Sequence, residues 1–138
     1  AGARNGIIPT DATDFGDISR GTKTAASCSN DTNDRMCIGG GNIEGTTGVN
    51  NIDYLTITST GNTSDFGDLT AGRTVPAAFS NGTDERGCWA GGSTYSAPTY
   101  SDSDIIDYIT INSTGNATDF GDCNFDGVEG GGLSDSQA

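Results

Sequence analysis

Hydrophobic residues occur in short runs that are separated by longer stretches of Gly, Ser, Thr and Asn. The two longest runs, 51–59 and 105–113, place Ile, Leu and Tyr at adjoining as well as alternating positions, so apolar side chains point to both faces. This distribution is typical of a strand that is covered on both sides. Shorter strands separated by turn sequences such as Asn-Gly are predicted at 22–29, 35–38, 73–80 and 87–90. No segment has the pattern of a helix.

The same landmarks recur along the chain in the same order. The tetrapeptide DFGD occurs at 14–17, 65–68 and 119–122, and IDY precedes the second and third copies. Alignment on these motifs gives a first repeat at 12–62 and a second at 63–116, both ending in STGN. A partial third repeat with a Gly-rich tail follows at 117–138, and 1–11 is predicted to be an extended arm. Because DFGD recurs and no kinase H-R-D motif accompanies it, we interpret it as structural.

Composition alone would place this chain among disordered proteins, because 32% of its residues are hydrophobic and its formal net charge is −13. The repeat favours a folded chain, because it concentrates the hydrophobic residues in the predicted strands. The six basic residues are scattered singly, which argues against binding to nucleic acid or to anionic membranes, and no apolar run is long enough for membrane insertion. Because the chain has no histidine, the commonest general base is missing, and we expect no enzymatic activity.

Four cysteines, Cys28, Cys37, Cys88 and Cys123, have neither the spacing of a zinc site nor a histidine to complete one. In a small chain with few hydrophobic residues they favour two disulfides and an oxidising, extracellular location. Cys28 and Cys37 flank the first predicted hairpin, so their strands are neighbours. By elimination Cys88 would pair with Cys123. The predicted disulfides are therefore Cys28–Cys37 and Cys88–Cys123.

The start of the partial third repeat resembles a calcium-binding loop. Asp122, Asn124 and Asp126 have the D-x-N-x-D spacing that supplies oxygen ligands to calcium, and a glycine follows. The bidentate acid expected at the twelfth position is replaced by Leu133. We favour a solvated acidic tail as the interpretation, with calcium as the one candidate cofactor.

Aromatic residues of the second repeat suggest a second kind of site. Tyr95 and Tyr100, in a variable loop, are candidate contacts for a glycan, because aromatic faces suit sugar rings. Trp89 lies in a predicted strand before a double glycine, and we interpret it as a core residue. Glycosylation sequons, which an Asn- and Thr-rich composition also generates freely, occur at Asn30, Asn62, Asn81, Asn112 and Asn116.

The order of these motifs resembles the repeat proteins in the virions of marine tailed phages, cyanophages in particular. Repeats of that family look like IDYITI…STGNATDFGD, followed by a Cys/Ser-Asn-Gly hairpin and a Gly-rich turn. Here the pattern lies at 106–122, with the hairpin at 80–86, and the ending at 131–136 is also similar. The resemblance covers nearly the whole chain from Ala12. It implies a structural component of the virion and brings no catalytic residues with it.

A weaker resemblance is to kelch-type β-propeller blades, in which a double glycine precedes a strand that ends in Tyr-Asp. Here a double glycine at 39–40 and 91–92 precedes Asp-Tyr at 53–54 and 107–108, and no Trp stands at the blade's usual place. A closed propeller needs about four to eight blades, whereas this chain has two repeats and a partial third.

We therefore predict an all-β fold of two kelch-blade-like antiparallel β repeats plus a partial third, in stacked sheets completed by strand exchange between subunits. Three DFGD strands accompany two complete sets of the other strands, so one end carries a surplus strand that can complete the sheet of a neighbouring molecule.

The predicted function is that of a non-enzymatic structural protein of a viral particle or extracellular filament, such as a phage tail, fibre or capsid-surface component. It would form a homo-oligomeric ring or a polymer through strand exchange. Other virion proteins and host-surface glycans are further expected partners. The alternative function is that of a secreted glycan-binding β-repeat module.

Overall fold

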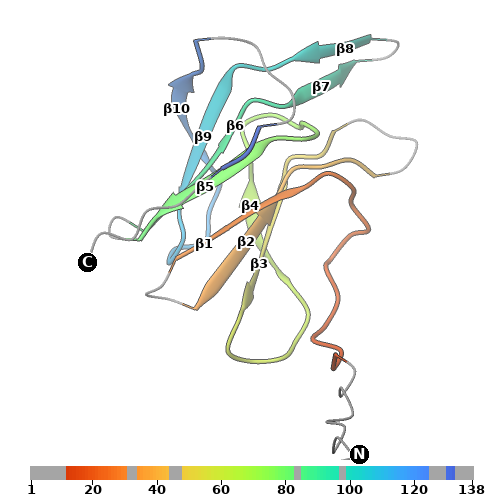
Figure 1. The fold of residues 1–138 in the computed structure, drawn as a ribbon, viewed down its shortest axis with the longest axis vertical. Coiled ribbons are helices and arrows are strands. Elements are labelled where there is room, and N and C mark those ends of the chain that lie inside the picture. Colours follow the sequence, from red (N-terminus) through yellow and green to blue (C-terminus); the bar gives the residue numbers. More distant parts are fainter. Residues whose placement is uncertain are drawn as a thin grey trace, which may run out of the picture.

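A computed structural model describes residues 12–30, 34–43, 48–82, 85–96, 99–124 and 130–132. The predicted arm at 1–11 and the calcium candidate Asp126 lie outside these residues. All regular elements in the described part are strands, as predicted, and they form two four-stranded antiparallel sheets and one two-stranded sheet (Figure 1). No helix of the described part is long and apolar enough to cross a membrane.

Each four-stranded sheet is built from one run of the chain. The first sheet has the order β1-β2-β3-β4 and contains β1 (Ala26–Ser29), β2 (Arg35–Gly39), β3 (Asn51–Thr56) and β4 (Ser64–Asp68). The second has the order β10-β9-β6-β5 and contains β5 (Ala77–Asn81), β6 (Arg86–Ala90), β9 (Ile105–Thr110) and β10 (Thr118–Asp122). The two sheets therefore have equivalent strands in the same spatial order, and the fold is open rather than closed into a propeller.

Two predicted elements differ from the structure. The variable loop of the second repeat contains a hairpin of β7 (Ser93–Ser96) and β8 (Thr99–Asp102), because its Ser, Thr and Tyr residues suit an extended chain. The first DFGD, at 14–17, is extended but not paired as a strand, since the described chain has no sheet before it to supply a neighbouring strand.

The two repeats share unusual backbone conformations. Positive φ angles occur at Thr24 (58°) and at the corresponding Val75 (47°), and again at Asp34 (49°) and the corresponding Glu85 (54°). Such angles are uncommon for residues other than glycine, so their recurrence indicates that the loops are equivalent in detail.

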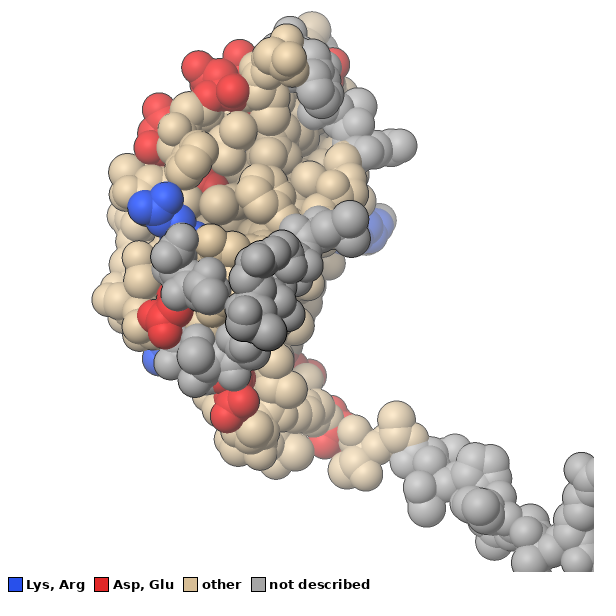
Figure 2. Space-filling view, turned by 60° about the vertical axis from the view of Figure 1, so that its left-hand side comes forward, with Lys and Arg blue, Asp and Glu red and all other residues tan. Residues whose placement is uncertain are grey.

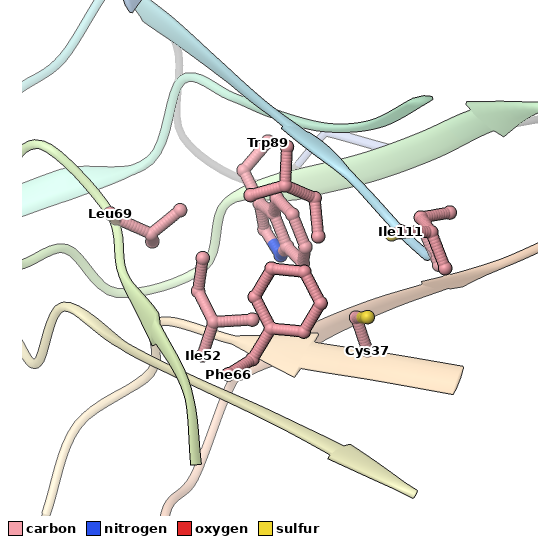
Figure 3. Close-up of a cluster of buried hydrophobic side chains, with 8 residues drawn as sticks. Cys37, Ile52, Phe66, Leu69, Trp89 and Ile111 are labelled. Atoms are coloured by element: carbon pink, nitrogen blue, oxygen red, sulfur yellow. The ribbon is translucent and has the colours of Figure 1, made fainter. Parts of the chain in front are cut away.

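The core lies between the two four-stranded sheets. Trp89 of β6 is 0% exposed and packs into a cluster with Ile52, Phe66, Leu69 and Ile111 (Figure 3). Its indole Nε1 donates a hydrogen bond of 3.1 Å to the carbonyl oxygen of Ala26 in the first sheet. Trp89 is thus a core residue, as predicted, and it joins the sheets by both packing and a hydrogen bond.

Replacing the buried indole should destabilise the whole chain. For Trp89→Ala we expect a loss of about 3–5 kcal/mol in the free energy of unfolding, because a large cavity would separate the sheets. Urea denaturation followed by circular dichroism measures this loss. Tyr100→Ala is the control, since Tyr100 is 67% exposed and its truncation should change stability by less than about 0.5 kcal/mol. Equal losses in the two variants would contradict the assignment of Trp89 as the centre of the core.

Candidate assembly interface

The DFGD motif of the first sheet is bound by the last turn of the second repeat. The carbonyl oxygens of Phe66 and Asp68 accept hydrogen bonds of 2.8 Å from the backbone N–H groups of Gly115 and Ala117. The side chain of Asn116 accepts a bond of 3.1 Å from the N–H of Asp68. We call this arrangement of a DFGD segment and a Thr-Gly-Asn turn the latch. It fixes the end of β4 against the turn between β9 and β10.

A second latch of the same design occurs at the other end of the molecule. Here the carbonyl oxygens of Phe15 and Asp17 accept bonds of 2.8 and 2.9 Å from Gly61 and Thr63. The side chain of Asn62 accepts a bond of 2.9 Å from the N–H of Asp17. Residues 14–17 therefore occupy, on the first sheet, the place that β4 occupies on the second.

The third DFGD motif has no such partner among the described residues. It forms β10, where Phe120 contacts Tyr108 edge to face at a centroid distance of 5.9 Å but is 57% exposed. The equivalent Phe66 makes the same contact with Tyr54, also at 5.9 Å, yet is only 2% exposed because the second sheet covers it. The outer side of β10 thus presents half of a latch.

The glycine of the DFGD motif lies very close to the Thr-Gly-Asn turn in each latch. A Cβ atom on Gly67 would lie 2.4 Å from the carbonyl oxygen of Gly115, and one on Gly16 would lie 2.2 Å from that of Gly61. The latch therefore requires glycine, because the turn approaches the strand too closely for a side chain. At Gly121 nothing lies within 4 Å of the same position, although its φ of 140° matches the 147° of Gly67.

The outer face of the first sheet corresponds to the face of the second sheet that is buried in the core. On the second sheet, Ile109 and Ile111 face the first sheet and are 3% and 0% exposed. Their counterparts on the outer face of the first sheet are Leu55, which is half-buried, and Ile57, which is 49% exposed. The first sheet therefore exposes an apolar face. The corresponding face of the second sheet is buried against the first sheet.

Arg35 joins the first sheet to the second sheet, and its equivalent Arg86 lies on the outer face of the second sheet. Arg35 lies over the ring of Tyr54 at 4.6 Å and donates a hydrogen bond of 3.0 Å to the carbonyl oxygen of Ile111. Arg86 lies in the same way over Tyr108 at 4.8 Å and is exposed. In a stack continued by another sheet, Arg86 would reach the position equivalent to Ile111, which is Ile57. The outer face of the second sheet and the outer face of the first sheet thus carry the same groups as the two sides of the interface between the sheets. We call these two outer faces the open ends.

The four predicted disulfide residues are all free thiols in the structure. Cys28 and Cys37 lie directly opposite each other on β1 and β2, so a bond between them stays a prediction. Cys88 pairs with Tyr108 of β9, whereas Cys123 follows Asp122, which pairs with the far end of β9 on the other side. This register separates Cys88 and Cys123 by about 15 Å, which exceeds the roughly 7 Å that a disulfide can span. The predicted Cys88–Cys123 bond does not fit this sheet, because β9 lies between their strands.

The remaining predicted site residues are not brought together. Asp122 and Asn124 are exposed next to β10, and no group of three His, Cys, Asp or Glu side chains in the described ranges is placed to hold a metal ion. Calcium binding stays a prediction. Tyr95 and Tyr100 are opposite each other on the β7–β8 hairpin, and Tyr100 is 67% exposed. Their role as glycan contacts also stays a prediction.

Sequence reasoning missed the role of the asparagines that end each repeat. Asn62 and Asn116 were noted only as glycosylation sequons, but their side chains accept the N–H of Asp17 and Asp68 in the two latches. The signal was present in the recurrence of STGN beside DFGD, because a polar side chain repeated at one turn position often bonds to nearby backbone.

The buried thiols make stability depend on alkaline pH. Burial raises the pKa of Cys37 from 9.0 to about 12, with Arg35 opposing the shift, and burial also raises the pKa of Cys28. Below pH 9 the thiols are neutral in both states and the stabilisation is complete. Above it the unfolded chain loses its protons first, so stability should fall as pH rises towards 12. Urea midpoints between pH 8 and 11, under reducing conditions, measure this slope. Cys37→Ala should make it shallower, and an unchanged slope would contradict the burial of this thiol.

No protein-family model matches the chain, and a search of the curated proteins finds no similar sequence.

Proposed function

We propose that this protein is a non-enzymatic structural component of a viral particle or an extracellular filament, and that it assembles head to tail by β-strand complementation. One observation carries the proposal. Three DFGD segments are present, two of them are latched, and the third exposes 57% of Phe120 where the equivalent Phe66 exposes 2%. A surface built like an interface and left uncovered within the chain fits a second copy of the chain.

The internal interface supplies the geometry of the contact. The outer side of β10 in one copy would bind the turn at 60–63 in the next copy. In the isolated chain this turn is bound by residues 14–19 of the same copy, which β10 would displace. Residues 130–132, which lie against Ala77 and Ala78 of β5, would be displaced by β1 of the incoming copy. Each copy thus exchanges terminal segments with its neighbours. Because the two surfaces differ, the contact is heterologous and produces a ring or an open filament.

The surface chemistry supports a structural role. Figure 2 shows Asp and Glu side chains spread over one face of the molecule with only isolated Lys and Arg among them. A formal net charge of −13 keeps separate molecules soluble, so association depends on the apolar ends rather than on the sides of the stack. The resemblance of the repeats to virion proteins of marine tailed phages supports the choice of a viral particle, with other virion proteins as neighbours.

The first test removes the exposed aromatic ring. Phe120→Asp should abolish the assemblies that the wild-type chain forms, because a carboxylate would be buried against an apolar face. Analytical ultracentrifugation and electron microscopy measure the size distribution. Tyr100→Asp is the matched control, since it makes the same change at an exposed aromatic residue of β8 that belongs to no DFGD motif. A wild-type chain that stays monomeric, or assembly that survives Phe120→Asp, would refute the proposed contact.

The second test uses the close approach at the latch glycine. Gly121→Ala should block assembly, because its Cβ meets nothing in the isolated chain but would collide with the carbonyl oxygen of Gly61 in the next copy. Gly115→Ala is the control for backbone strain, since Gly115 also has a positive φ (157°) and open space at its Cβ. Sedimentation should separate the two variants, with Gly121→Ala smaller. Equal assembly of both would show that β10 does not form a latch between copies.

A further inference from the structure

The second repeat holds a buried arginine in a defined set of acceptors. The side chain of Arg73 is 0% exposed, and its Nη1 donates hydrogen bonds of 2.6 Å to the carbonyl oxygen of Ile105 and 3.3 Å to that of Gly91. Its Nη2 forms a salt bridge with Asp107, which is also 0% exposed. The hydroxyl of Thr70 donates a further bond of 2.6 Å to Asp107. A guanidinium group therefore neutralises this buried carboxylate.

The first repeat has the same acceptors but no arginine. Gly40, Asn51 and Asp53 correspond to Gly91, Ile105 and Asp107, whereas Thr22 stands at the position of Arg73. The frame is conserved between the repeats, because the Gly40 N–H donates 3.1 Å to the Asn51 carbonyl and the Gly91 N–H donates 3.0 Å to the Ile105 carbonyl.

The shorter side chain of Thr22 leaves a cavity in the first repeat. Gly40, Asn51 and Asp53 line it together with Ile18 and Thr22. The space that the centre of a water-sized group can occupy in it is about 10 Å³, which is room for one such group, for example a terminal NH₂. Ile18 is 41% exposed at this end of the molecule, so the cavity opens towards solvent. A planar cation can therefore insert one edge while the rest of the ligand stays at the mouth.

The carboxylate of the first repeat lacks a cationic partner. Asp53 is 7% exposed and accepts hydrogen bonds from the backbone and hydroxyl of Ser19 and, at 3.2 Å, from the hydroxyl of Thr63. Among the described residues, no lysine or arginine forms an ion pair with it. A buried carboxylate that is held only by neutral donors attracts a cation more strongly than an exposed one does.

We propose that the Asp53 cavity is a binding site for a guanidinium group. The carboxylate of Asp53 and the carbonyl oxygens of Gly40 and Asn51 would accept its N–H groups, as Asp107 and its neighbours accept those of Arg73. The guanidinium comes either from a small molecule or from an arginine side chain. The site is complete within the isolated chain, whereas the proposed assembly would displace residues 14–19 and with them Ile18 and Ser19 of the cavity.

The experiment is a titration with methylguanidinium at millimolar concentration, followed by the chemical shifts of the backbone amides. It is carried out on Phe120→Asp, so that the state of assembly does not affect the result. We expect saturable shifts centred on residues 18–22 and 51–53, and little effect of methylammonium, which cannot present two parallel N–H groups. Absence of binding, or equal binding of the two cations, would overturn the proposal.

Variants test the individual groups of the site. Asp53→Asn should weaken binding by roughly tenfold or more, because it removes the charge that the guanidinium pairs with. Thr22→Arg should abolish binding and raise the melting temperature, because the new side chain would fill the cavity from within. If Thr22→Arg lowers the melting temperature and leaves binding intact, the cavity is not the guanidinium site.

A second arm distinguishes the sources of the guanidinium. A peptide with one arginine, blocked at both ends, should compete with methylguanidinium if an arginine of another protein is the ligand. Binding of methylguanidinium without competition by the peptide would assign the site to a small molecule. Arg20 lines the mouth of the cavity. If methylguanidinium binds to Arg20→Ala but not to the chain that keeps Arg20, then Arg20 itself occupies the cavity, and the proposal of a site for an external guanidinium is overturned.

Discussion

The apolar layer between the two sheets is the constraint on which the rest of the structure depends. Each sheet has four short strands and few large hydrophobic side chains, so a single sheet cannot bury enough apolar surface to be stable alone. Stacking solves this problem, because one layer of Trp89, Phe66 and their neighbours serves both sheets. The same arrangement leaves each sheet with a second face on which an apolar side chain is exposed, Ile57 on the first sheet and Phe120 on the second. The open ends of the molecule thus follow from how the core is built.

The sequence predicted those features that its own periodicity encodes. Alternating and adjoining hydrophobic residues at 51–59 and 105–113 predicted the long strands β3 and β9, and the DFGD spacing predicted the repeat. Cover on both faces stays a prediction, because Ile57 and Phe120 on the outer faces are 49% and 57% exposed. Contacts between distant positions were harder to predict. The hydrogen bond from the N–H of Asp68 to the Asn116 side chain and the salt bridge of Arg73 join residues far apart in the chain, and the recurrence of motifs does not by itself identify such partners. The supposed Cys88–Cys123 bond failed for the same reason, since elimination among cysteines ignores the strand that lies between them.

The two repeats stabilise an equivalent buried aspartate in two different ways. Each IDY motif places an aspartate inside the stack, and each aspartate needs donors. Arg73 supplies charge and hydrogen bonds together to Asp107, whereas among the described residues the side chain of Asp53 has only the neutral donors Thr63 and Ser19. Thr63 starts the second repeat, and the residue that starts the third is Ala117, so the hydroxyl that bonds to Asp53 is absent beside Asp107, where the arginine is present. The pairing of these differences indicates that the substitutions compensate each other.

The N-terminal latch has a consequence for the kinetics of any association. Residues 14–17 are covalently tethered beside the turn that they occupy, so they compete with an incoming strand at an effective concentration in the millimolar range. An incoming DFGD segment makes the same hydrogen bonds as the one that it replaces, and the exchange of these bonds is nearly neutral in free energy. The net gain must come from burial of the apolar faces, which the tethered segment does not cover. In the proposed assembly, the latch would therefore set the register of neighbouring molecules, while the hydrophobic faces would determine the concentration at which they begin to associate.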